Sequence, residues 1–99
     1  MEDKKTYYDK MHAQVRDWAA KIDELITKAD KATGEKKVEY EEQIKKLKAK
    51  KADAEVMLQE LLTSGEETWK DIKGSLEKIS VDVQSSFKKF LYGEGGKKE

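Results

Sequence analysis

The sequence contains no cysteine and no proline, and its only histidine is His12. Without cysteine the chain has neither a disulfide framework nor thiolate chemistry, and one histidine alone cannot supply the usual ligand set of a zinc site. A glycine-rich phosphate loop and a nucleophile elbow are missing as well. We therefore expect no catalytic residue, no metal ligand and no cofactor, and a protein that is not an enzyme.

An excess of charge of either sign is also missing. Charged residues make up 42% of the sequence, but 21 Lys and Arg balance 21 Asp and Glu, and the balance holds in each third of the chain. A surface of this kind has no long-range field to attract nucleic acid or an anionic membrane. No apolar run has the length of a membrane span or of a signal peptide. We expect a cytoplasmic protein that does not bind nucleic acid.

What the sequence does contain is an apolar residue at every third or fourth position along almost its whole length. This spacing places the apolar residues on one face of a helix. In the first third the apolar stripe consists of Tyr8, Met11, Val15, Trp18, Ile22 and Leu25. In the rest of the chain it consists of Tyr40, Ile44, Leu47, Ala54, Leu58, Leu61, Trp69, Ile72, Leu76, Ile79, Val83 and Phe90, with Lys51 occupying one of its positions.

These stripes predict an all-α protein with a single helical coiled-coil domain over residues 1–92. We expect a long helix over about 4–62, a turn at 63–65 and a helix over about 66–91 that folds back on it as an antiparallel hairpin. Ser64 followed by Glu67 fits a capping box for the second helix. Residues 93–99, rich in glycine and lysine, should form a flexible tail.

An up-down-up three-helix bundle with a turn at Gly34 is the alternative architecture. A helix buried against two neighbours needs a wide apolar face, whereas charged residues flank the middle and last stripes, as in a two-stranded coiled coil. This difference favours the hairpin. Because the hairpin leaves the stripe from Tyr8 to Leu25 uncovered, it predicts that this stripe binds a second copy of the chain, as a homodimer, or another helical protein.

The segment 87–92, which mixes aromatic residues with lysines, allows a second functional interpretation. Such a segment can dip into a membrane interface, although we favour its packing at the end of the hairpin, near Val38 and Tyr40. The leading hypothesis is thus a non-enzymatic helical scaffold that acts through helix contacts. The alternative is an amphipathic protein that binds reversibly to a membrane surface or shields other molecules.

Several short stretches carry a resemblance to a known family. They are Tyr8-x-x-Met11, Asp17-Trp18-x-x-Lys21-Ile22-Asp23-x-Leu25, Tyr40-Glu41-x-Gln43-Ile44-x-x-Leu47, Thr68-Trp69-x-x-Ile72-Lys73-Gly74-Ser75-Leu76-Glu77 and Phe87-x-x-Phe90. In these stretches the chain resembles a family of small bacterial coiled-coil proteins associated with stress response. The resemblance implies a cytoplasmic, non-enzymatic protein and no catalytic residue. Gly34 departs from the family pattern, in which the first helix runs on without glycine.

Overall fold

The protein is all-α, as its apolar periodicity predicts. The computed structural model describes residues 3–93. Within them lie α1 (Lys4–Lys31), α2 (Gly34–Thr63) and α3 (Glu66–Phe87), followed by a short π-helical segment, η1 (Lys88–Gly93). The predicted tail over 93–99 lies outside the described residues, apart from Gly93 at the end of η1.

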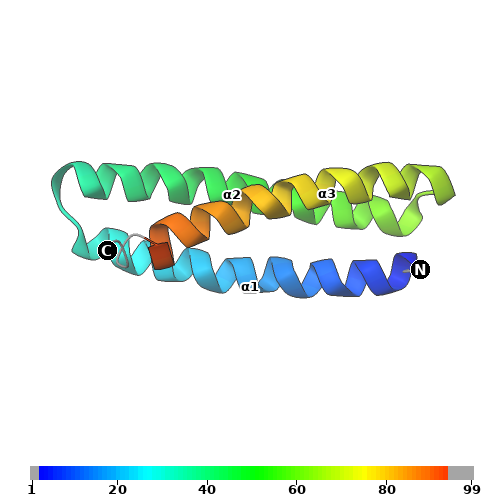
Figure 1. Cartoon of the computed structure of the whole chain (residues 1–99), viewed down its shortest axis with the longest axis horizontal. Coiled ribbons are helices and arrows are strands. Elements are labelled where there is room, and N and C mark those ends of the chain that lie inside the picture. The colour runs from blue at the N-terminus through cyan, green and yellow to red at the C-terminus, as the bar shows by residue number, and fades with distance from the viewer. Residues whose placement is uncertain (1–2, 94–99) are drawn as a thin grey trace.

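The three helices pack closely side by side. α1 and α2 run antiparallel to each other, and α3 runs back along α2 in the same direction as α1 (Figure 1). The Cα atoms span 48 × 25 × 17 Å. A helix of about 30 residues is about 45 Å long, so the length of the molecule is that of one helix.

The expected continuous helix over 4–62 is wrong, because the chain reverses between α1 and α2. Ala32 and Thr33 are extended, with ψ of 160° and 163°, and Gly34 has a φ of +62°. A positive φ of this size is readily adopted only by glycine. The reversal breaks backbone hydrogen bonds, but it lets the apolar stripe of α1 be buried against α2. The expected helix over 66–91 is also shorter, because α3 ends at Phe87.

The helix caps differ from the predicted capping box. Ser64 does not cap α3; its hydroxyl donates a 2.9 Å hydrogen bond to the carbonyl of Leu61, and the residue before α3 is Gly65. At α1 the cap is Asp3, whose carboxylate accepts a 2.8 Å hydrogen bond from the backbone N–H of Thr6. Hydrogen bonds from Thr6 lower the pKa of Asp3, because they stabilise the charged carboxylate.

Two lysines at opposite ends of α1 bind the C-terminal ends of the other helices. The Lys4 ammonium donates to the carbonyl of Ser64 at 2.8 Å, just beyond α2. The Lys28 ammonium donates to the carbonyls of Phe90 and Leu91 at 3.1 and 3.5 Å, in η1. The last carbonyls of a helix have no partner within the helix and carry partial negative charge. α1 therefore supplies both cations that satisfy them.

The apolar stripes of all three helices meet in one core. Trp18 on α1 is 2% exposed and Trp69 on α3 is 7% exposed, and both belong to the same cluster of buried side chains. The ring of Trp69 lies against that of Tyr7, with 6.1 Å between the centroids. Since the two tryptophans lie on different helices of one core, the helices should unfold together.

We predict that Trp18→Ala and Trp69→Ala each lower the free energy of unfolding by about 3–5 kcal/mol, because each leaves a cavity in the shared core. Urea unfolding followed by far-UV circular dichroism should show one transition in each variant. Val81→Ala is the control, since Val81 is 66% exposed and its truncation should change stability by less than about 0.5 kcal/mol. A Trp18→Ala protein in which residues 36–91 keep their helix and their stability would contradict the shared core.

Two glycines should respond to alanine with opposite signs. A Cβ added at Gly34 or at Gly74 meets no atom within 4 Å, so neither substitution is limited by space. Gly34→Ala forces a left-handed conformation on alanine and should lower stability by about 1–2 kcal/mol. Gly74→Ala lies inside α3 and should raise it by about 0.8–1 kcal/mol. Urea unfolding measures the change in the free energy of unfolding for both variants. Changes of the same sign would refute the assignment of a turn at Gly34.

Candidate functional site

The stripe that was expected to bind a second copy lies inside the chain's own core. Met11, Val15, Trp18, Ile22 and Leu25 are each at most 4% exposed. α2 packs along α1 and covers these residues. Self-association was predicted because the stripe on the first helix was expected to be uncovered, and this reason no longer applies.

The first residue of that stripe is Tyr7 rather than Tyr8. Tyr7 is 3% exposed, and its hydroxyl donates a 3.4 Å hydrogen bond to the carbonyl of Lys73 on α3. Tyr8 is half-buried and stacks on His12, with 5.7 Å between the ring centroids. Spacing alone could not separate the two tyrosines, because both lie on the same face as Met11, one turn away.

Of the residues expected in the hairpin core, all are buried except Ile72 and Ile79, which are half-buried. Phe90 packs edge-on against Tyr40, with 6.0 Å between the ring centroids. Phe87, which is not part of the stripe predicted from the sequence, is 2% exposed and belongs to the core. Phe87 follows Val83 by four residues, so the spacing of the stripe could have identified it as a buried residue.

Ser80 is the one buried polar side chain among the described residues. Its hydroxyl donates to the amide oxygen of Gln14 on α1 at 3.1 Å and accepts from the amide nitrogen of Gln84 at 3.2 Å. Both hydrogen-bonding roles of the hydroxyl are thus satisfied, as burial requires. This contact fixes where α3 lies along α1, and it leaves no reactive group free.

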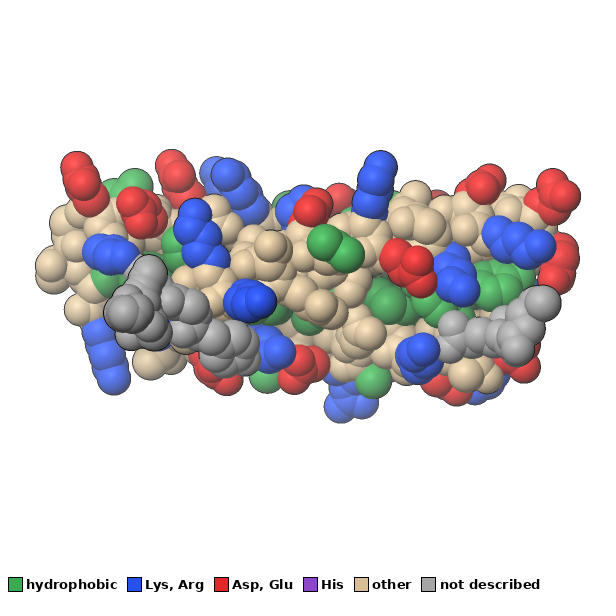
Figure 2. All heavy atoms as spheres, in the orientation of Figure 1, with side chains coloured by type: hydrophobic (Ala, Val, Ile, Leu, Met, Phe, Trp, Pro, Cys, Tyr) green, Lys and Arg blue, Asp and Glu red, His purple; other side chains and the backbone are tan. Residues whose placement is uncertain are grey.

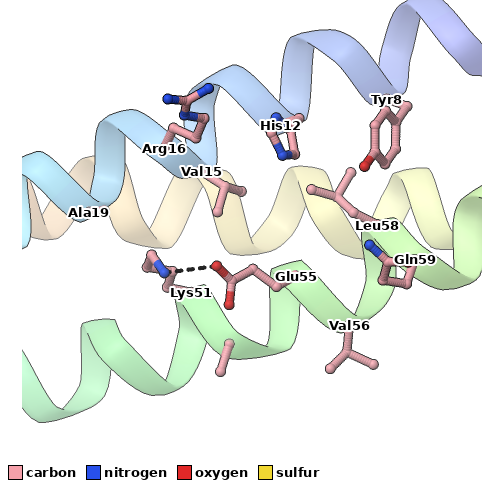
Figure 3. A pocket seen from close by; sticks show the side chains of 11 residues that line it. Tyr8, His12, Val15, Arg16, Ala19, Lys51, Glu55, Val56, Leu58 and Gln59 are labelled. Atoms are coloured by element: carbon pink, nitrogen blue, oxygen red, sulfur yellow. Dashed lines mark hydrogen bonds and ion pairs between the residues drawn. The ribbon is translucent and has the colours of Figure 1, made fainter.

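A groove lies between α1 and α2, and we call it the α1–α2 groove. Its larger hollow has a volume of about 520 Å³ and is lined by Tyr8, His12, Val15, Arg16, Ala19, Lys51, Ala52, Glu55, Val56, Leu58 and Gln59. Figure 3 shows the residues of α1 along one edge and those of α2 along the other, with Leu58 and Val15 between them. A second hollow of about 310 Å³ shares Ala19, Ala52 and Glu55 with it and extends the groove to Asp23 and Lys48.

Lys51 explains why the packing opens here. It stands at a position of the α2 stripe where neighbouring turns carry Leu47 and Ala54, which are both buried. A lysine ammonium cannot be buried without a partner, so its side chain reaches toward the surface and binds the carboxylate of Glu55 at 2.8 Å. The dashed line in Figure 3 marks this ion pair. Alanines at positions 19 and 52 add too little volume to close the gap.

Charges of both signs stand along the groove. Arg16 and Asp23 belong to α1, and Lys48 and Glu55 to α2. Among the residues that the structure describes, Arg16, Asp23 and Lys48 form no ion pair within the chain, whereas Glu55 binds Lys51. The groove thus combines an apolar floor with charged edges that remain available for pairing.

The interface between α1 and α3 is also incompletely filled. A hollow of about 290 Å³ is lined by Tyr7, Lys10, Met11, Gln14, Glu77, Ser80 and Val81. Figure 2 shows apolar side chains at the surface near the ends where α1 and α3 begin, and basic and acidic side chains mixed over the rest of the viewed face. This hollow is smaller than the α1–α2 groove and is crossed by the Ser80–Gln14 hydrogen bond.

Comparison with protein-family models, with curated proteins and with solved structures gives no significant match. Over the described part of the chain, no group of three or more His, Asp or Glu side chains is arranged to hold a metal ion. No helix within residues 3–93 is long and apolar enough to cross a membrane. The α1–α2 groove is the feature on which a functional proposal can be built.

Lys51→Leu should stabilise the protein and narrow the groove. Leucine at this position of the stripe can enter the core beside Leu47, and burying its side chain should raise the free energy of unfolding by about 1.5–3 kcal/mol. Loss of the Lys51–Glu55 ion pair should lower it by at most about 1 kcal/mol. Urea unfolding measures the gain, and the exposed Lys46→Leu is the matched control. Equal stability of Lys51→Leu and the wild-type chain would show that Lys51 does not cause the opening.

Proposed function

We propose that the protein is a non-enzymatic helical scaffold that acts by binding helices, either those of a second copy or those of another helical protein. The observation that carries the proposal is the α1–α2 groove, which is lined by the small side chains of Ala19 and Ala52 and has charges along both edges. Small residues let a neighbouring helix approach closely, and charged edges select its position and direction.

The shape of the groove suits a helix better than a small substrate. It runs along two antiparallel helices, and a helix can fill such a groove with side chains one turn apart. Catalysis would instead require polar groups that converge in a closed pocket from which water is excluded. The Lys51 ammonium and the Glu55 carboxylate, which lie in the groove, bind each other at 2.8 Å.

We also infer that the three helices form an up-down-up bundle in solution. Its support is the single cluster of buried side chains to which all three contribute. The tryptophan variants described above test this architecture, because a long two-helix hairpin would give the two variants different unfolding behaviour.

The setting of this scaffold rests on sequence resemblance alone. The likeness to small bacterial coiled-coil proteins of the stress response suggests a role under stress, and the proposal includes a cytoplasmic location. Helix binding and a role in the stress response would be connected if the helical partner is present or exposed only under stress.

A reversible membrane-surface or shielding protein is the alternative function. It is favoured by the incompletely filled interface between α1 and α3, with its hollow of about 290 Å³, since separating α3 would expose amphipathic faces to lipid. The segment 87–92 favours the scaffold instead. Phe87 and Phe90 are at most 8% exposed in the folded chain, so their rings are not available to enter a membrane interface.

Circular dichroism with lipid vesicles separates the two functions. We expect a strongly helical spectrum in plain buffer that changes little when vesicles of phosphatidylglycerol and phosphatidylcholine are added, because the apolar stripes are already covered. Leu76→Asp is the control for the vesicles: Leu76 is fully buried, and a carboxylate there should unfold the chain in buffer and let lipid restore helix. A wild-type chain that is unordered until vesicles are added would overturn the scaffold proposal.

A further inference from the structure

We propose that the α1–α2 groove binds the same face of a second copy of the chain, so that α1 packs antiparallel on α1 and α2 on α2. This inference rests on the proposed scaffold function and names its partner. A two-fold axis would cross the groove at right angles to the helices, at the level of Ala19 and Ala52, where the chains approach most closely.

The order of charges around the two alanines is what selects a second copy. On α1, Arg16 precedes Ala19 by three residues and Asp23 follows it by four. A two-fold axis at Ala19 therefore brings Arg16 of one copy opposite Asp23 of the other, and the symmetry repeats this pair. Opposite charges so placed guide two chains into one register.

The second helix shows the same arrangement. On α2, Lys48 precedes Ala52 by four residues and Glu55 follows it by three. An axis at Ala52 brings Lys48 of one copy opposite Glu55 of the other. Glu55 binds Lys51 through one carboxylate oxygen, and its side chain is 53% exposed, so its other oxygen can accept from Lys48.

Both alanines lie at one level of the molecule, which allows a single axis to satisfy both helices. Ala19 and Ala52 line both hollows of the groove together, and Asp23 lies with Lys48 in the second hollow. An isologous contact requires this kind of self-complementary face. The small side chains at its centre allow the two chains to approach closely.

A two-fold axis parallel to the helices would place α1 on α2 of the second copy. In the antiparallel register of the groove, Arg16 is level with Glu55 and Asp23 with Lys48, so this axis would also set opposite charges face to face. The two arrangements are separated by experiment, because only the perpendicular axis pairs Arg16 with Asp23 and brings the two copies of position 19 together.

Charge reversal tests the pairing directly. Sedimentation equilibrium should give a dimer for the wild-type chain and a dissociation constant raised at least about tenfold by Arg16→Asp or by Asp23→Arg, since each places like charges opposite each other twice. The double variant R16D/D23R should restore dimerisation. Both positions are exposed, and circular dichroism verifies that each variant is folded. Lys78→Asp, on the exposed side of α3, is the matched control and should leave the mass unchanged.

The absence of cysteine from the natural sequence allows a second test. Ala19→Cys should form a disulfide-linked dimer when the protein is oxidised with diamide, because the two copies of position 19 meet at the axis within disulfide reach. Ala13→Cys, an exposed position of α1 away from the groove, should stay unlinked.

Three results would overturn this inference: a monomer at every concentration, a double variant as weak as the single ones, or an unlinked Ala19→Cys chain. None of these would refute the scaffold proposal, because a folded, helical monomer can still bind a different helical protein. Failure of the scaffold proposal has its own signature, an unordered chain in plain buffer.

Discussion

The structure depends on a shortage of apolar side chains. Apolar residues are 36% of the sequence and charged residues 42%, so each helix has enough for about one stripe. A single stripe is buried only against other stripes. The chain therefore reverses twice, at residues 32–34 and 64–65, and brings three stripes to one common axis. The surface around this axis consists mostly of charged and small residues; among the residues that the structure describes, the exposed large apolar side chains are Val38, Val56, Leu62 and Val81.

The same shortage explains which parts of the fold could be predicted from the sequence. The helical class and most of the buried residues follow from the spacing of apolar residues, which is a local property of the chain. The break after Lys31 could not be predicted in this way. It depends on the free energies of two whole structures: a continuous helix that leaves its apolar stripe exposed, and an interrupted helix that buries the stripe. Gly34 was visible as a possible turn, but its positive φ belongs to the folded chain. The choice between Tyr7 and Tyr8 depended on Trp69, which is distant in sequence.

The candidate site was less predictable than the core. The sequence directed attention to the apolar stripe of the first helix, and the structure buries that stripe. Lys51 was recognised as a charge within a stripe, but the opening that follows from it requires Ala19 on another helix at the same level. A groove is a property of two surfaces together, so its residues have no common periodicity in the sequence. The charges at positions 16 and 23 of α1 can be recognised as one edge of a groove only when the charges of α2 are seen beside them.

The uneven closure of the molecule has a consequence for its motion. α1 and α2 contact each other along most of their length, whereas α3 contacts α2 more than α1 and leaves a hollow beside Ser80. Parts of a protein with fewer buried contacts open at lower free energy than the whole molecule. α3 with η1 is thus the segment whose amide protons should exchange with solvent first, while the pair of α1 and α2 keeps its protection. Lys28, which donates hydrogen bonds to the carbonyls of Phe90 and Leu91, connects the end of this segment to α1.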